Sequence, residues 1–236
     1  MARKRVLITG AGTGIGLACT KMFLDGGWEV LAHYHRSCQE LKNLQRSYTS
    51  LDIVQADFSN AGQVKKFLKT VRREKLHALV NNAAVYDFSY NSSDRMKAAQ
   101  DVLFVNVIVP TLLAETVFDV MKKLGEGHIV NVSSVGAKYG SSQEHVFYGI
   151  SKRGLEALTR TLARAGAPFN ISVNTVRPGV IDTPFHDKIK RDMRKRSAMI
   201  PMKRMGKPEE VASLIYHLCD AQTFMTNQTI TVAGGE

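Results

Sequence analysis

A glycine-rich stretch at residues 9–16, TGAGTGIG, decides the fold class of this chain. It follows a short β-branched run, Arg5–Thr9, and opens a helix-length stretch, Ile15–Asp25. Glycine lets a backbone approach a pyrophosphate closely, and the N-terminus of a helix offers it free N–H groups. Glycines also mark ordinary turns, but their place between a first strand and a first helix favours a dinucleotide-binding loop. The residues expected to bind the cofactor here are Gly10, Gly12, Thr13, Gly14, Ile15 and Gly16.

The rest of the chain alternates between strand-length and helix-length segments. The predicted strands are Arg5–Thr9, Glu29–Tyr34, Leu51–Ala56, His77–Asn81, His128–Val132, Ile171–Val176 and Thr229–Val232. The predicted helices are Ile15–Asp25, Gln39–Tyr48, Ala61–Arg73, Ser93–Lys123, Tyr148–Ala165 and Pro208–Cys219. This alternation predicts an α/β fold: a single Rossmann-type domain over residues 1–236, with a doubly wound parallel sheet and helices on both faces.

The composition is that of a globular protein. Hydrophobic residues make up 44% of the 236 residues and charged residues 22%. The longest apolar run, Val102–Leu113, is broken by Asn106 and Pro110 and is shorter than a membrane span. The apolar part of the N-terminus is too short for a signal peptide. The three cysteines match no metal motif, so we expect reduced thiols, no metal and a cytoplasmic location.

The end of the second predicted strand indicates the cofactor. NAD enzymes usually carry an acidic residue there to bind the ribose 2′-hydroxyl, but no Asp or Glu lies between Glu29 and Glu40. Arg36 and Ser37 stand in its place, and they can bind a 2′-phosphate through a guanidinium and a hydroxyl. Arg36 could equally be a solvated loop residue. With the glycine loop before it, the segment favours NADPH.

Tyr148 and Lys152 carry the strongest chemical signal. They lie four residues apart, so they share one face of a predicted helix. A nearby ammonium lowers the pKa of a phenol, which would make Tyr148 a useful general acid for a carbonyl oxygen. A Tyr and Lys at this spacing can also be a purely structural pair.

Two further candidates lie upstream of this pair. Ser134 and its neighbour Ser133 follow a predicted strand, where a hydroxyl could bind a substrate carbonyl or simply form a turn. Asn106 precedes Pro110 by four residues, and proline has no N–H for the Asn106 carbonyl. That carbonyl is free to hold a water molecule, or the helix is merely kinked.

Taken in order, these motifs resemble those of the classical short-chain dehydrogenase/reductases, and most of all their 3-oxoacyl-[acyl-carrier-protein] reductases. The resemblance covers essentially the whole chain and implies a catalytic tetrad of Asn106, Ser134, Tyr148 and Lys152, with a water relay from Asn106 to Lys152. The residues that it implies for cofactor binding outside the glycine loop are His35, Arg36, Ser37, Asp57, Phe58, Asn82, Ala83, Tyr148, Lys152, Pro178, Gly179, Ile181 and Thr183. The run His35-Arg36-Ser37 also looks like that of pteridine reductases.

The chain departs from the family pattern in three places. Ala84 replaces the glycine of the usual Asn-Asn-Ala-Gly, and Ala233 replaces the aspartate of a closing Asp-Gly-Gly. Ser134 lies fourteen residues before Tyr148 rather than the usual thirteen, which leaves Ser133 as an alternative catalytic serine.

The expected function is NADPH-dependent reduction of a ketone, of the 3-oxoacyl thioester type, with Tyr148 as general acid. The alternatives are a pteridine, quinone or diketone reductase, and a non-catalytic NADP-sensing or nucleic-acid-binding protein. The intact tetrad argues against the last. The resemblance also implies a homotetramer and a substrate lid at about residues 184–207.

Residues 187–207 hold nine Lys or Arg and two Asp, a net +7 of the chain's +11. A basic rim at the substrate entrance could attract an acidic acyl carrier protein, although most such charge runs are solvated surface.

Overall fold

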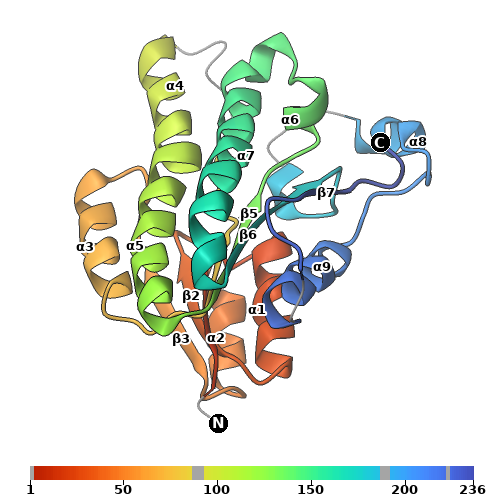
Figure 1. Ribbon diagram of the computed structural model, residues 1–236. Coiled ribbons are helices and arrows are strands. Elements are labelled where there is room, and N and C mark those ends of the chain that lie inside the picture. Colours follow the sequence, from red (N-terminus) through yellow and green to blue (C-terminus); the bar gives the residue numbers. More distant parts are fainter. Residues whose placement is uncertain (1–2, 87–92, 187–191, 222–223) are drawn as a thin grey trace.

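Seven strands form one parallel sheet in the computed structural model, which describes residues 3–86, 93–186, 192–221 and 224–236 (Figure 1). The order across the sheet is β3-β2-β1-β4-β5-β6-β7. The strands are β1 (Arg5–Ile8), β2 (Glu29–Tyr34), β3 (Leu51–Gln55), β4 (Ala78–Asn81), β5 (Gly127–Val132), β6 (Ile171–Pro178) and β7 (Thr229–Val232). Successive strands are added on one side of β1 up to β3 and on its other side from β4 onward. Parallel α/β sheets bind ligands at the carboxyl edge where the strand order reverses in this way, here between β1 and β4. The predicted fold class is confirmed.

Helices cover both faces of the sheet (Figure 1). One face carries α1 (Gly14–Asp25), α2 (Gln39–Gln45) and α9 (Pro208–Asp220), and the other carries α3 (Ala61–Val71), α4 (Arg95–Leu103), α5 (Val109–Leu124) and α7 (Val146–Gly166). Side chains alternate between the two faces of a strand. Accordingly, Val6 and Ile8 of β1 belong to one core cluster, and Leu7 between them belongs to the other.

The long helix predicted at Ser93–Lys123 differs from the prediction in its middle. A π-helical turn, Phe104–Ile108, separates α4 from α5 and contains Asn106. Pro110 lies two residues after this turn and cannot donate an N–H to the carbonyl of Asn106, which accounts for the change of helical form at this point. The predicted helix at Gln39–Tyr48 also ends earlier, at Gln45.

One continuous helical stretch, Arg95–Leu124, is long and apolar enough to cross a membrane by length and composition. More than half of its apolar window is buried inside the protein. Leu113 and Met121 of this stretch, for example, are fully buried in the core cluster that also contains α3 and α7 residues. Packing against the sheet and the neighbouring helices therefore accounts for its apolar character.

Short elements at the carboxyl edge of the sheet were not predicted. They are α6 (Gly136–Tyr139), α8 (Met193–Met199) and 3-10 turns at Gln143–His145 and Pro184–His186. They surround the entrance to the cavity described next, and of the expected lid, residues 187–191 lie outside the described residues.

Candidate active site

A cavity of about 900 Å³ opens at the carboxyl edge of the sheet, where residues after β1 through β6 line it. Most of the predicted site residues lie in this lining: Gly10, Gly12, Thr13, Gly14, Ile15, His35, Arg36, Ser37, Asp57, Phe58, Asn82, Ala83, Ser134, Tyr148, Lys152, Pro178, Gly179, Ile181 and Thr183. Gly16 and Asn106 are not part of the lining that the structure describes. The fold thus brings together residues that are spread over almost the whole sequence.

The glycine loop is packed too tightly for side chains at two of its positions. A Cβ atom on Gly12 would lie 1.9 Å from the carbonyl oxygen of Ser37, and one on Gly16 would lie 2.1 Å from the carbonyl oxygen of Gly10. Gly16 therefore serves the packing of α1 against the loop rather than the lining of the cavity. This side-chain-free turn at a helix N-terminus fits the pyrophosphate of a dinucleotide.

Thr9 and Asn82 hold the glycine loop against the end of β4. The side-chain amide nitrogen of Asn82 donates to the carbonyl oxygens of Thr9 at 2.9 Å and Gly10 at 3.2 Å. In return, the Thr9 hydroxyl accepts the backbone N–H groups of Asn82 and Ala83, both at 3.0 Å. The side chain of Asn82, predicted as a cofactor contact, is thus engaged with the loop itself.

His33 is a residue of this site that the sequence analysis missed. Its side chain is buried in β2, where Nδ1 accepts from Gly10 N at 3.3 Å and Nε2 lies 3.0 Å from Ala56 O. These partners require the proton on Nε2, and burial lowers the pKa of His33 to about 4, so the ring is neutral. It stacks on Phe58 with ring centroids 3.9 Å apart. The sequence signal that could have identified His33 is a histidine within the otherwise apolar residues of β2.

One end of the cavity, formed by residues after β2 and β3, combines two basic side chains with one carboxylate, and we call it the far end. His35, Arg36 and Ser37 are exposed after β2, and His35 Nε2 lies 3.6 Å from Asp57 Oδ2. A hydrogen bond from Ser59, together with His35 and Arg36, holds the pKa of Asp57 below its usual range. Asp57 is therefore an anion beside the two basic residues.

Tyr148, Ser134 and Lys152 meet at the other end of the cavity. The side chain of Ser134 interacts with the Tyr148 hydroxyl and favours a lower pKa of that phenol. Lys152 follows one helical turn later in α7, with Nζ 5.7 Å from the centroid of the Tyr148 ring. The Lys152 ammonium donates to the carbonyl oxygen of Val132 at 2.8 Å. Both side chains are buried, so their chemistry is screened from bulk water.

The expected lowering of the Tyr148 pKa by Lys152 is not what the protein alone produces. Burial raises the pKa of Tyr148, the interaction with Ser134 opposes this, and the neighbouring Tyr86 adds to it. Burial also lowers the pKa of Lys152 to about 8. The reason is that both groups lose water, while the ammonium is directed to Val132 O.

Asn106 is fully buried in the π-helical turn and acts through its side chain. Its amide nitrogen donates to Val85 O at 2.9 Å and to the Ser151 hydroxyl at 3.1 Å, and its amide oxygen accepts from Val85 N at 2.8 Å. Ser151 in turn donates to Tyr148 O at 2.7 Å. The Asn106 side chain thus joins the residues after β4 to the start of α7.

The Ser133 side chain belongs to a buried ionic network that the sequence did not reveal. The Ser133 hydroxyl lies 2.9 Å from Glu156 Oε1 and 3.2 Å from Lys152 O. Arg177 donates two hydrogen bonds of 2.9 Å to the same carboxylate, and Arg153 donates one of 2.8 Å. Burial opposes ionisation, but the Arg177 and Ser133 hydrogen bonds hold the pKa of Glu156 below its ordinary value. Ser134, not Ser133, has its hydroxyl at Tyr148.

Aromatic side chains gather around Tyr148. The Tyr86 ring centroid lies 4.9 Å from that of Tyr148 and 4.4 Å from that of His145. Phe185 lies 5.6 Å from Tyr86 and 6.1 Å from Tyr148. We call Tyr86, His145 and Phe185 the aromatic wall. They lie two or three residues from predicted motifs, but nothing in their spacing along the chain indicated contact.

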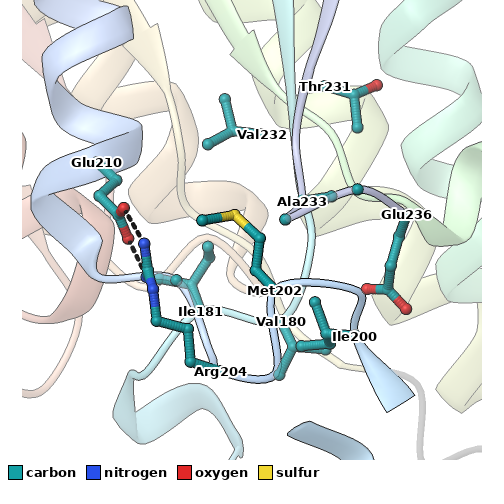
Figure 2. Close-up of a pocket in the computed structure, with 13 residues that line it drawn as sticks. Val180, Ile181, Ile200, Met202, Arg204, Glu210, Thr231, Val232, Ala233 and Glu236 are labelled. Carbon is teal, nitrogen blue, oxygen red and sulfur yellow. Dashed lines mark hydrogen bonds and ion pairs between the residues drawn. The ribbon is translucent and has the colours of Figure 1, made fainter. Parts of the chain in front are cut away.

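A second cavity of about 440 Å³ lies between β7 and the segment that leads to α9. Figure 2 shows Met202 among Ile181, Val232 and Ala233 on its walls. Arg204 forms two hydrogen bonds of 2.8 and 2.7 Å with Glu210, as the dashed lines in Figure 2 mark.

Ion pairs engage part of the basic segment 187–207, the predicted lid. Arg196 of α8 pairs with Glu236, and Arg204 pairs with Glu210. Within the described ranges, Arg194 and Lys195 belong to no ion pair. The remaining basic residues at 187–191 lie outside the described residues. In the described part of the chain, no group of His, Cys, Asp and Glu could hold a metal ion.

Comparison with known proteins gives consistent matches over the whole chain. A family model described as "Enoyl-(Acyl carrier protein) reductase" matches residues 10–236. The chain is 34% identical to Protein FixR of Bradyrhizobium diazoefficiens, covering 99% of this chain and 86% of that protein. It is 34% identical to the 3-oxoacyl-[acyl-carrier-protein] reductase FabG of Thermotoga maritima, covering 98% and 97%. Dehydrogenase/reductase SDR family member 4 of Homo sapiens is 33% identical, covering 100% and 88%.

Solved structures that contain NADP or NADH resemble this fold. A Beutenbergia cavernae protein assigned as an NAD(P)-dependent gluconate 5-dehydrogenase, with NADP bound at low occupancy, has a TM-score of 0.89 and 26% identity, covering 100% of this chain and 97% of that one. A 4-hydroxyisoleucine dehydrogenase complexed with NADH has a TM-score of 0.85 and 29% identity, covering 99% and 98%.

Proposed function

The chain belongs to the short-chain dehydrogenase/reductase family, and on that premise we propose that it reduces a ketone to an alcohol with NADPH. Membership makes the protein an NAD(P)-type oxidoreductase. The preference for NADPH, the ketone substrate and the role of each residue are our proposal.

One observation carries this function: the buried Tyr148 shares one cavity with Ser134, with the glycine loop and with Lys152, whose Nζ lies 5.7 Å from the centroid of the Tyr148 ring. The cofactor supplies the hydride when it is bound. A ketone oxygen placed between Ser134 and Tyr148 receives two hydrogen bonds. Tyr148 then gives its proton to that oxygen as negative charge develops there.

Lys152 and Asn106 are suited to replacing that proton. Lys152 has a pKa of about 8 because of burial, so its ammonium can exchange a proton near neutral pH. The Asn106 side chain and the Ser151 hydroxyl fix the beginning of α7, on which Tyr148 and Lys152 stand. A water on the Asn106 carbonyl would complete the relay.

The basic pair at the far end of the cavity supports NADPH over NADH. Arg36 and His35 stand at the lining, where a guanidinium can bind a 2′-phosphate through two hydrogen bonds. Asp57 is already engaged with Ser59 and lies 3.6 Å from His35. In our proposal a bound phosphate replaces water around these basic groups.

For the substrate we propose a 3-oxoacyl thioester, because FabG of Thermotoga maritima is 34% identical over nearly the whole chain. Such a substrate would arrive on an acidic acyl carrier protein, which the basic lid would attract. The second candidate is a quinone, diketone or pteridine, which the aromatic wall favours. We further propose a cytoplasmic homotetramer, the expectation that the family resemblance carries.

NADPH oxidation tests this function directly. We expect turnover with one class among acetoacetyl thioesters, enoyl thioesters, diketones, quinones and dihydropteridines. Tyr148→Phe should reduce that turnover by about 10²- to 10⁴-fold while NADPH binding stays within a few-fold, because only the general acid is lost. Turnover of an enoyl thioester alone would reject ketone reduction. NADPH binding without turnover of any compound would favour a sensor, the non-catalytic alternative.

A further inference from the structure

The substrate end of the cavity is aromatic, and Lys152 is the one described charge in it that no carboxylate pairs. The aromatic wall, Tyr86, His145 and Phe185, adjoins Tyr148 with ring centroids 4.9 Å from Tyr86 and 6.1 Å from Phe185. Among the described lining residues at this end, Arg196 and Glu236 pair with each other. The other charged groups of the lining are Lys152 beside Tyr148, and Arg36 and Asp57 at the far end.

These two features together restrict what can lie next to Tyr148. A charged substrate would need a partner, and the guanidinium and carboxylate that could supply one neutralise each other. Aromatic faces attract flat conjugated rings in offset-stacked or edge-to-face geometry, which saturated rings cannot adopt. The wall is held from two sides, since Tyr86 follows β4 and Phe185 follows β6.

We infer that the site selects an uncharged carbonyl compound with a flat, conjugated ring next to the carbonyl, and that Tyr86 and Phe185 determine this selectivity. The inference rests on the proposed function and, of the two substrate candidates given there, favours ring-bearing carbonyl compounds over the 3-oxoacyl thioester. The reaction is balanced as carbonyl plus NADPH plus a proton giving alcohol plus NADP⁺. The ring stacks on the wall while the carbonyl oxygen meets Ser134 and Tyr148.

A matched substrate pair tests the inference. Methyl phenyl ketone and methyl cyclohexyl ketone carry the same reacting group on a flat and on a puckered ring. We would measure kcat/KM for both with NADPH and use the ratio, phenyl over cyclohexyl, in each variant. Comparing this ratio between variants cancels the different intrinsic reactivity of the two ketones.

Phe185→Leu and Tyr86→Leu remove a ring but keep an apolar side chain. A ring contact contributes about 0.5–1.5 kcal/mol, which is about 2- to 12-fold, so we expect each variant to lower the ratio within that range. Tyr86→Phe keeps the ring and should keep the ratio. Tyr139→Leu is the control, because Tyr139 is an exposed aromatic residue of the same lining whose ring contact is with Lys138.

A second measurement tests the inference without any variant, in case a leucine variant folds poorly. The inhibition constants of 1-phenylethanol and 1-cyclohexylethanol, measured on the unmodified protein, should favour the phenyl compound. An unchanged ratio in both leucine variants, or tighter inhibition by the cyclohexyl alcohol, would overturn the inference. Absence of turnover with every carbonyl compound would instead reject the proposed function, so the two failures are distinguishable.

Discussion

Ser133 and Glu156 are hydrogen-bonded at 2.9 Å inside the protein, and this contact separates the roles of two adjacent serines. Glu156 is almost fully buried and also forms an ion pair with Arg177. The contact ties the segment after β5, which contains Ser134, to α7, which contains Tyr148. The same short segment therefore contributes a structural serine and, in our proposal, a catalytic one.

Replacing each serine by alanine should separate these roles. Ser134→Ala removes a donor to the substrate oxygen, so we expect kcat to fall about 10²- to 10³-fold with little change in stability. Ser133→Ala should lower the free energy of unfolding by about 1–2 kcal/mol and leave kcat within a few-fold. Steady-state kinetics and urea unfolding measure both. The reverse pattern would make Ser133 the catalytic serine.

Glu156→Gln should destabilise the protein by about 3 kcal/mol, because it leaves the Arg177 guanidinium without its charged partner. The change should also alter the pH dependence of stability. The pKa of Glu156 is lowered in the folded protein, so its contribution is present above the unfolded pKa and is lost as pH falls through the folded value. Unfolding between pH 3 and 7 (about the range in which carboxylates titrate) should show a shallower acid loss in the variant. Identical acid profiles would contradict this.

The pKa of Lys152, about 8, predicts the alkaline limb of the reaction. For carbonyl reduction we expect kcat/KM to fall as pH rises through about 8, because the ammonium that resupplies the proton is lost. Lys152→Gln should be slow and should lack this limb. Lys138→Gln, which changes an exposed lysine nearby, should keep it. A limb that persists in Lys152→Gln belongs to another group.

Arg36→Asp should shift the cofactor preference from NADPH towards NADH. The variant loses a charged hydrogen bond to the 2′-phosphate, which is about a 10- to 100-fold effect, and adds repulsion. Calorimetric dissociation constants for both cofactors give the ratio. Equal affinity of the unmodified protein for the two cofactors would remove the basis for NADPH.

Charge reversal on the lid tests the acyl carrier protein. Arg194→Glu with Lys195→Glu should reduce turnover of a carrier-linked substrate and its sensitivity to salt, while a small thioester is little changed. Arg72→Glu with Arg73→Glu is the matched control, because these exposed residues follow α3 and precede β4, at the opposite edge of the sheet. Equal losses on both substrates would show a structural lid. No loss on either would show solvated surface.

The sequence by itself determined the fold class and identified a set of site residues, most of which the fold brings into one cavity. Local rules gave the fold class, the glycine loop between a strand and a helix, and the placement of Tyr148 and Lys152 on one helical face. The family resemblance gave the catalytic tetrad and the cofactor contacts outside the loop. Because parallel strands end at the same edge of a sheet, residues placed after strands had to meet there.

Tertiary structure decided what depends on contacts between distant residues. The Ser133 hydroxyl is engaged by Glu156, twenty-three positions away, and the His33 ring is fixed by Gly10 and Ala56. The pKa of Tyr148 rises because burial outweighs its interaction with Ser134, and burial is a property of the packed chain. Hydrogen bonds, ring stacking and desolvation act over a few ångströms in space, and sequence spacing does not encode those distances.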